Sequence, residues 1–282
     1  MAGSNIGDYI KALKEYDVLS PFIVCHKKLP KKKAEYGAMS PPLPEPIVRL
    51  LKGMGIDNLY AHQAEAINRI RAGSHTVVAT PTASGKTLIY TIPVIEGLLQ
   101  DPESRALYLF PLKALAQDQL KSLRALFDAL DTRPKPRAEV YDGDTPSHRR
   151  TKIRSKPPQV ILSNPEMLHL SILPFHDRWA EFIGKLQFVI VDEVHTLRGV
   201  MGSHMAWVFR RLLRICSIYG ASPLFIFCSA TIGNPQRLAS ELTGLSGCRR
   251  AESFWGLGCP KMSHEHGDTL DFQIRAAIAR YS

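Results

Sequence analysis

The chain has 282 residues, 45% of them hydrophobic, a content that suits a globular protein of one large or two small domains with a buried core. No apolar run reaches the roughly 18–20 residues of a membrane span, no signal peptide opens the chain, and the five cysteines form no C-x-x-C pair, so we expect a cytoplasmic protein without a disulfide framework. The formal net charge of +10 favours an anionic partner, usually nucleic acid, although many basic proteins carry only a solvated lysine surface.

Residues 1–58 are predicted to form an N-terminal extension with a proline-rich linker. Its first part, 5–16, has apolar residues at helical spacing and is expected to be a helix. The lysines of 27–33 either touch phosphates or form a solvated charge run. The proline-rich stretch 40–44 is typical of a stiff linker, and a short helix is expected to follow it over 46–53.

Apolar runs alternate with helical patterns from residue 59 to residue 245. Several runs, such as 107–110 and 188–191, are continuously apolar, as in strands that lie buried between two layers of helices. This pattern predicts a single α/β domain over 59–245, built on a mostly parallel, doubly wound sheet that binds its ligands at the carboxyl ends of the strands. The predicted strands are 75–80, 105–110, 137–141, 158–163, 187–192 and 223–228, and the predicted helices are 60–72, 85–98, 113–129, 146–154, 202–218 and 234–243.

The stretch 80–87, Thr-Pro-Thr-Ala-Ser-Gly-Lys-Thr, is the predicted phosphate-binding loop. It follows an apolar strand and leads into a helix, which is the context that such a loop requires. Lys86 is expected to reach the terminal phosphates of a nucleotide, and the Thr87 hydroxyl to complete the coordination of Mg²⁺. Thr80 stands where the general pattern has its first glycine, so an ordinary strand–loop–helix turn stays open as an alternative. The small residues that would let the backbone N–H groups converge on a polyphosphate are Thr82, Ala83, Ser84 and Gly85.

Two acidic residues, Asp192 and Glu193, follow the apolar run 188–191. A carboxylate at the end of a buried strand is costly unless a cation pairs with it, and Mg²⁺ is the natural candidate. Asp192 is therefore expected to hold the metal opposite Thr87, and Glu193 to polarise the water that attacks a phosphate. The alternative for the acidic pair is a helix N-terminus, where such residues are favourable.

A histidine and two hydroxyl residues are predicted to complete this edge of the sheet. His195 is expected to project toward the next strand end, where it would meet Ser229 and Thr231 and couple hydrolysis to a neighbouring surface. Alone, the tripeptide 229–231 would be an unremarkable turn. Its place at a strand end, after the acidic pair and the phosphate loop, favours the functional interpretation.

The motifs together resemble those of the superfamily-two helicases of the DEAD/DEAH-box group. The stretches that carry the resemblance are 80–87 (motif I), 110–119 (motif Ia), 163–168 (a strand-contacting loop), 192–195 (motif II) and 229–231 (motif III). Over 59–243 the chain is most similar to the branch of DNA helicases related to mitomycin repair factor A. The resemblance implies a RecA-like domain that hydrolyses Mg-ATP and translocates on nucleic acid, expected to be single-stranded DNA. It also implies that Gln63, 17 residues before Thr80, reads adenine.

Contacts to a nucleic-acid strand are predicted at Lys113, Gly143 and Asn164, because a lysine at a helix start, a small residue in a loop and an amide can all hold phosphates. Without the resemblance, Lys113 is equally well explained as a surface lysine. The basic segment 149–154 either extends this path or forms a solvated helix face.

A helicase of this group has two RecA-like domains, with ATP in the cleft between them. No second such domain is recognisable, and residues 246–282 are expected to form an atypical, disordered tail. A zinc site there is not expected, because C-x4-H-x-H is a poor match to known ligand spacing. We expect a truncated protein or one part of a split helicase, whose second half is supplied elsewhere and which alone hydrolyses ATP slowly and unwinds nothing. An RNA-acting relative and a non-catalytic nucleic-acid-binding remnant are the alternatives.

Overall fold

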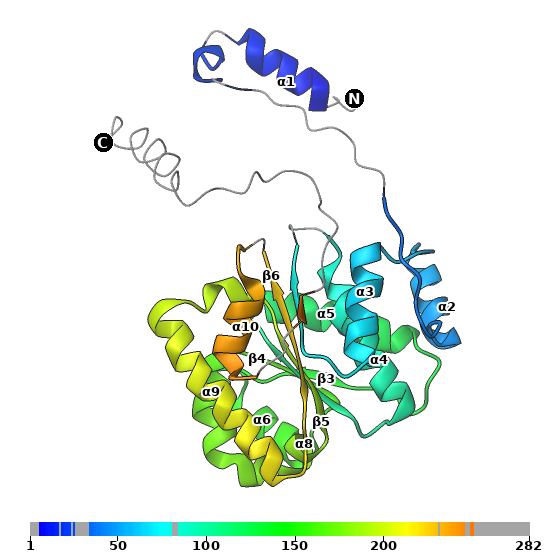
Figure 1. Ribbon diagram of the computed structural model, residues 1–282, viewed down its shortest axis with the longest axis vertical. Helices are drawn as coiled ribbons and strands as arrows, with labels where there is room; N and C mark the ends of the chain where they lie inside the picture. The colour runs from blue at the N-terminus through cyan, green and yellow to red at the C-terminus, as the bar shows by residue number, and fades with distance from the viewer. Residues whose placement is uncertain are drawn as a thin grey trace. The chain divides into compact units, whose positions relative to one another are not determined.

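The computed structural model describes residues 6–16, 18–23, 25, 34–80, 84–230, 232–245 and 249–250 (Figure 1). The chain divides into two compact units, residues 1–35 and 36–282. Residues 36–58, which the sequence assigns to the extension, therefore fall in the second unit. None of the described helices combines the length and the apolarity that a bilayer crossing requires.

The N-terminal unit contains helix α1 (Ile6–Glu15) and a single 3₁₀ turn, η1 (Ser20–Phe22). The helical N-terminal segment that the apolar spacing predicts is confirmed. No residue of α1 is buried, and the side chains of Ile6, Tyr9 and Tyr16 are largely exposed. The lysines of 27–33 that belong to the predicted basic cluster lie outside the described residues.

The second unit is built on a parallel sheet with the strand order β3-β4-β2-β5-β6-β1-β7, as the continuously apolar runs predict. The two-residue strand β7, which pairs with β1, is an addition to the six predicted strands. Chain order and spatial order differ, so that β1, β6 and β5 lie side by side although the chain visits β2 to β4 between them. The strands are β1 (Thr76–Ala79), β2 (Arg105–Leu109), β3 (Ala138–Val140), β4 (Val160–Ser163), β5 (Leu186–Val191), β6 (Leu224–Ser229) and β7 (Arg249–Arg250).

Helices cover both faces of the sheet, so the central strands are buried on both sides. Successive strand residues point to opposite faces: Val189 packs in one core and Ile190 in the other. One core lies under α2 (Glu45–Gly53), α3 (Ala61–Arg71), α4 (Lys86–Gln100) and α5 (Lys113–Ala129). The other lies under α8 (Ala180–Gly184), α9 (Gly199–Ile218) and α10 (Pro235–Thr243), while α6 (Ser147–Ser155) follows β3.

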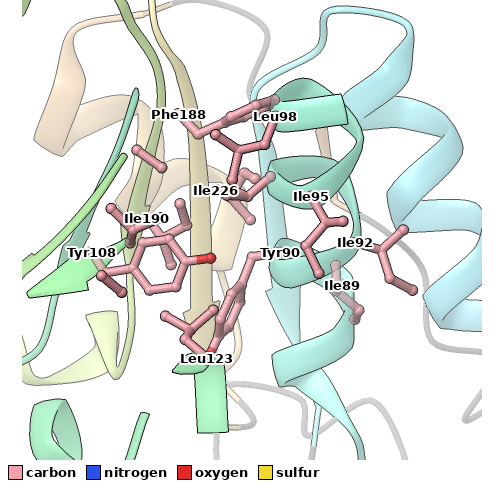
Figure 2. Packing of buried hydrophobic residues seen from close by; sticks show 14 of the residues in the cluster. Ile89, Tyr90, Ile92, Ile95, Leu98, Tyr108, Leu123, Phe188, Ile190 and Ile226 are labelled. Carbon is pink, nitrogen blue, oxygen red and sulfur yellow. The ribbon is translucent and has the colours of Figure 1, made fainter. Parts of the chain in front are cut away.

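Helix α4 is the element that fixes the phosphate loop to the sheet. Figure 2 shows its side chains Tyr90 and Ile95 within the cluster that also contains Ile190 and Ile226 of the sheet. The ring of Tyr90 meets the ring of Tyr108 edge to face, with 5.4 Å between their centroids. Because the helix is anchored along its length, its N-terminus at Lys86 is held at the carboxyl edge of β1.

The segment between β4 and β5 is helical, which the sequence does not predict. It changes type three times, from α7 (Pro165–Met167) through a π turn η2 (Leu168–Ile172) and 3₁₀ turns η3 (Leu173–Trp179) to α8. The backbone is non-helical at Phe175, one residue after Pro174. A segment with this many interruptions has no sustained 3.6-residue period, and the buried ring of Trp179 shows that packing holds it instead.

Candidate nucleotide and nucleic-acid site

Three strand ends meet at the carboxyl edge of the sheet. Thr80 directly follows β1, Ser229 ends β6 and Asp192 directly follows β5, and in the sheet these strands are neighbours in the order β5-β6-β1. The phosphate loop leaves β1 and enters α4 at Lys86. The sheet therefore brings the predicted phosphate, metal and coupling residues to one edge, although more than 140 residues separate the first from the last.

The phosphate loop is closed by hydrogen bonds among its own residues. The hydroxyls of Thr80 and Ser84 lie 2.6 Å apart, and Gly85 has φ +73°, in the left-handed region. The Lys86 ammonium donates to the carbonyl oxygens of Thr80, at 3.2 Å, and of Ser229, at 3.0 Å. Lys86 thus ties β1 to β6. Predicted loop residues Thr82 and Ala83 lie outside the described residues.

Gln63 lies against the phosphate loop and is almost fully buried. Its side-chain oxygen accepts from the backbone N–H of Tyr60 at 2.9 Å, and its Nε2 donates to the carbonyl of Gly85 at 3.0 Å. A Cβ at position 85 would collide with that Nε2, so both the positive φ and the close approach require glycine there. The structure therefore gives Gln63 a positioning contact that the sequence does not predict, while its reading of adenine stays a prediction.

Three aromatic rings stack beside Gln63. The ring centroids of Tyr36 and Tyr60 are 5.7 Å apart and those of Tyr60 and His62 are 5.8 Å apart, both nearly parallel. The Nε2 atom of His62 lies 3.1 Å from the carbonyl oxygen of Ser84 in the phosphate loop. Sequence reasoning missed this stack, because Tyr36 and Tyr60 meet only through an isolated antiparallel bridge.

The acidic pair begins where β5 ends. Burial raises the pKa of the Asp192 carboxyl above its ordinary value, and one carboxylate oxygen accepts the backbone N–H of Glu193 at 2.9 Å. Glu193 has φ +51°, the one positive value at a non-glycine position in the described part of the chain. A left-handed glutamate is strained, and such strain concentrates at functional sites. The left-handed backbone at Glu193 turns the chain away from the direction of β5.

His195 joins the acidic pair to β6. Its Nδ1 lies 3.1 Å from a Glu193 carboxylate oxygen and 3.4 Å from the hydroxyl of Ser229. Ser229 is fully buried and is the last residue of β6, so His195 contacts this strand at its buried carboxyl end. The structure brings these three predicted residues together, while Thr231 lies outside the described residues.

Oxygen ligands suitable for Mg²⁺ are present at the same edge. Asp192 offers a carboxylate and Thr87 a hydroxyl, both hard donors, and Mg²⁺ usually binds one or two such protein groups together with substrate phosphates and water. Within the described ranges no group of three or more His, Cys, Asp or Glu side chains could hold a metal ion alone. This donor set fits a metal that arrives with a nucleotide better than a structural one.

The loop after β3 forms the second part of the edge. The Lys113 ammonium pairs with the Asp144 carboxylate at 2.8 Å, which raises the pKa of the lysine, and lies beside Gly143. Arg150 holds the same loop from within: it donates to the carbonyl oxygens of Thr145 at 2.8 Å, Asp142 at 2.9 Å and Gly143 at 2.7 Å. By its sequence this arginine belongs to the basic segment 149–154, because a sequence does not show toward which neighbours a helical arginine points.

The neighbouring arginine, Arg149, pairs with a residue of strand β3. Arg149 pairs with Glu139 at 3.1 Å, and Glu139 also pairs with Arg124 at 3.2 Å. Arg154 also donates to the Thr151 hydroxyl at 3.3 Å. Three of the four cations of the segment 149–154 are therefore engaged within the protein, which disfavours a continuous basic path over it.

Asn164 lies at the end of β4 and begins α7. Its side-chain oxygen accepts from the backbone N–H of Met167 at 2.8 Å, the usual bond of a helix cap. The amide nitrogen is not used in that bond. A contact from Asn164 to a strand stays a prediction, and the cap is its observed role.

Comparison with known proteins identifies the same region of the chain. A family model described as DEAD/DEAH box helicase matches residues 60–238. The Bacillus subtilis protein named uncharacterized ATP-dependent helicase YprA is 47% identical over 211 residues, which is 73% of this chain and 28% of YprA.

Two solved structures share the fold. The DUF1998 helicase MrfA bound to DNA aligns with a TM-score of 0.80 and 41% identity over 89% of this chain and 32% of MrfA. MrfA bound to DNA and AMPPNP aligns with a TM-score of 0.76 and 44% identity over 80% of this chain and 31% of MrfA. The predicted RecA-like fold and the helicase resemblance are confirmed, and the chain spans less than a third of the length of these relatives.

Proposed function

The chain belongs to the DEAD/DEAH box helicase family, and from this premise we propose that residues 59–245 are an ATP-dependent motor domain that acts on DNA. The observation that carries the proposal is the continuous set of contacts from Lys86 through Ser229 and His195 to Glu193. It joins the predicted phosphate, coupling and water-activating residues in one arrangement.

Lys86 is proposed to hold the terminal phosphates of ATP. An ammonium has three N–H donors, and two of them already point at the carbonyls of Thr80 and Ser229. The lysine head is thereby placed between two strand ends while a third donor is left for a phosphate oxygen. The N–H groups at the start of α4 would hold the same phosphates.

Mg²⁺, held by Thr87 and Asp192, would neutralise charge that develops on the transferred phosphate. Glu193 would accept the proton of the attacking water, and His195 would hold that carboxylate through its Nδ1 atom. Because Nδ1 also faces the Ser229 hydroxyl, rotation of the imidazole would change its contact with Ser229 at the end of β6. This is the proposed route from hydrolysis to the rest of the domain.

Gln63 is proposed to read adenine from its place beside the loop. Its oxygen is engaged by Tyr60 and one Nε2 proton by Gly85, which leaves the second Nε2 proton as a donor to the base. The exposed ring of Tyr60 and the half-buried ring of His62 stack with nearly parallel planes next to it. A flat aromatic surface beside an amide suits a purine.

DNA is proposed as the polymer, and a single strand as the form that is tracked. MrfA, which shares 41% identity with the chain, carries DNA in its solved structure. Lys113, Gly143 and Asn164 follow β2, β3 and β4, so they line the carboxyl edge beside the nucleotide residues. Contacts of this kind hold the sugar–phosphate backbone and carry no sequence information.

The other half of the ATP site is proposed to come from outside residues 1–282, on the same polypeptide or on a partner. An arginine finger from such a half is worth about 10³–10⁵ in rate. By themselves these 282 residues should therefore bind Mg-ATP, hydrolyse it slowly and unwind nothing. Robust unwinding by the chain alone would contradict this part of the proposal.

The test is the ATPase rate of the chain with no polymer, with single-stranded DNA and with RNA, with Lys86→Ala as the control. Stimulation by DNA alone, lost in Lys86→Ala, is the expected result. Equal stimulation by RNA would indicate an RNA-acting helicase. A rate that equals that of Lys86→Ala under all three conditions would identify a binding remnant without catalysis.

A further inference from the structure

Helix α9 presents an outward face that the nucleotide site does not use. Its inward residues, among them Met205, Phe209 and Leu212, are buried in the core that lies between the sheet and α8, α9 and α10. Figure 1 shows α9 at the edge of the domain, with α10 beside it. The outward residues recur at intervals of three and four, which places them on one stripe: Val200, His204, Trp207, Arg211, Arg214 and Ile218.

A tryptophan stands at the centre of this stripe. The side chain of Trp207 is 72% exposed, and the guanidinium of Arg210 lies over its ring at 5.7 Å from the centroid. Arg210 also donates to the backbone carbonyl of Glu241 on α10 at 3.0 Å, so the stacked pair is held in place. An exposed indole contributes nothing to the core, and a flat ring backed by an arginine is a surface on which a base can stack.

The charge of the stripe is of one sign. The twenty residues of α9 include three arginines and one histidine and no acidic residue. In the described part of the chain, neither Arg211 nor Arg214 has an ion-pair partner. Arg214 lies before the last turn of α9. The attraction of the helix dipole for cations fades within that turn, so it does not explain an arginine at this position. The complementary ligand is an anion with several charges in a row.

The stripe is separate from the predicted strand path at the carboxyl edge. Lys113, Gly143 and Asn164 follow β2, β3 and β4, whereas α9 connects β5 to β6 and packs on α10. The helix begins just after the acidic pair and runs back along the domain for about 27 Å from Val200 to Ile218, at about 1.5 Å per residue. A strand that passes the motor edge can therefore reach the stripe at its Val200 end.

We propose that the outward face of α9 is a second binding site for single-stranded nucleic acid, with a base on Trp207 and phosphates on Arg211 and Arg214. The inference rests on the proposed function, since it presumes a strand at the motor edge. An acidic protein is the competing occupant. Two features favour the strand: the arginine-backed indole offers a stacking plane, and consecutive arginines on one face match the repeating charge of a phosphate backbone.

The experiment uses the full 282-residue chain and a twenty-residue oligothymidylate. Binding is followed by tryptophan fluorescence and by anisotropy of a labelled oligonucleotide over a range of salt concentrations. Trp207→Phe identifies the signal of that residue, since the other described tryptophan, Trp179, is fully buried. The double variant Arg211→Gln/Arg214→Gln removes the phosphate contacts. Its control is Arg49→Gln/Arg237→Gln, which removes two exposed arginines that pair within their own helices.

The expected result is quenching of Trp207 by the oligonucleotide. We expect roughly tenfold weaker binding by Arg211→Gln/Arg214→Gln, and a logarithmic salt dependence that is shallower by about 1.4, at about 0.7 per phosphate contact. Trp207→Ala should bind several-fold more weakly, because one base loses its stacking partner. The control double variant should bind within about twofold of the wild type. Basal ATPase rates and melting temperatures should not change in any variant.

Two results would overturn the inference. Unchanged oligonucleotide binding by the α9 variants, without a Trp207 signal, would show that the face serves another occupant, such as an acidic protein, while the proposed function would stand. Absence of binding and of ATPase stimulation in the wild type would count against the proposed function itself, and the second site would fall with it.

Discussion

The ammonium of Lys86 donates a hydrogen bond to the carbonyl oxygen of Ser229 at 3.0 Å, across 143 positions of the chain. This bond joins the start of α4 to the end of β6. Since the Ser229 hydroxyl also faces Nδ1 of His195, which in turn faces Glu193, a single serine contacts the phosphate lysine through its backbone and the histidine through its side chain. A shift of β6 would therefore act on both groups at once.

Glu193→Gln should lose hydrolysis and keep ATP binding. An amide cannot accept the proton of the attacking water, so we expect kcat to fall by about 10²-fold or more. The dissociation constant for ATP should stay within about threefold, because this carboxylate is not proposed to hold the nucleotide. Steady-state ATPase assays and equilibrium binding of a fluorescent ATP analogue measure the two quantities.

Glu193→Gly tests the strain at the same position. Glycine adopts φ +51° without the penalty of a side chain, so this variant should be more stable than Glu193→Gln by about 1 kcal/mol. Both should be inactive. Equal stability of the two variants in urea unfolding would mean that the left-handed backbone stores no strain.

Asp192→Asn should make the protein more stable and unable to use Mg-ATP. Burial raises the pKa of Asp192, so the folded state holds this proton more tightly than the unfolded state. The stabilisation that comes from the protonated carboxyl is complete below the pKa that Asp192 has in the unfolded state. It is lost as the pH rises through the higher pKa that Asp192 has in the folded state. An amide stays neutral throughout. The variant should thus gain about 1 kcal/mol at pH 7, or roughly 2–4 °C in melting temperature, and the difference from wild type should shrink toward pH 4.

Mg-ATP should raise the melting temperature of the wild type and leave Asp192→Asn unchanged. The exposed Asp131 provides the control, since Asp131→Asn removes a carboxylate from the loop between α5 and β3, which leads into a strand and does not follow one. If Asp192→Asn were less stable than the wild type at pH 7, favourable contacts in the folded protein would have to offset the cost of burying the Asp192 carboxylate.

Arg150→Gln should weaken the action of DNA without changing the basal ATPase rate. The substitution removes the bonds to three carbonyls of the loop 142–145, each worth about 1.5–3 kcal/mol when the donor is charged. Without these bonds, Gly143 and Asp144 in the loop should be held less firmly in position. We expect the DNA concentration for half-maximal stimulation to rise about tenfold, with the rate in the absence of DNA within twofold.

Arg149→Gln is the matched control, because the guanidinium of this adjacent arginine donates to Glu139 and not to a carbonyl of the loop. It removes the same charge from the same helix. Arg150→Lys should recover only part of the effect, since one ammonium cannot match the geometry of a guanidinium. An equal loss in the variants at 149 and 150 would assign the effect to charge and not to loop position.

Gly85→Ala and Gln63→Ala should be strongly coupled. The added methyl group collides with Nε2 of Gln63 and sits at a positive φ, so Gly85→Ala should cost about 2–4 kcal/mol in the free energy of unfolding. Gln63→Ala removes the collision partner together with its hydrogen bonds. In the double variant, Gly85→Ala should therefore cost about 1–2 kcal/mol less than in the wild type.

Nucleotide competition separates the two roles of Gln63. If it reads adenine, Gln63→Ala should lose the preference for ATP over UTP, while Gly85→Ala weakens both nucleotides alike. A preserved preference in Gln63→Ala would leave Gln63 with its positioning contact alone.

The order and type of the main elements followed from local patterns. Continuously apolar runs such as 188–191 predicted buried parallel strands, because only strands covered on both faces can dispense with alternation. The phosphate loop with Lys86 follows one predicted strand, Asp192 follows a second and Ser229 follows a third. Because parallel strands end on the same side of a sheet, this order predicted one ligand edge. The irregular helical segment after Asn164 had no such pattern, since its turns change type and its residues are held by packing around Trp179.

Side-chain direction was decided by tertiary structure. Arg149 and Arg150 are neighbours with the same chemistry, yet one pairs with Glu139 and the other holds a loop, because successive helical residues point about 100° apart and meet different surroundings. In the same way, Gln63 meets Gly85 only because α3 packs against the start of α4. The sequence by itself determined which chemical groups stand at the strand ends, through hydrophobic periodicity and motif spacing. Which of those groups contact one another was left to the packing of helices on the sheet, since such contacts join residues that no local pattern connects.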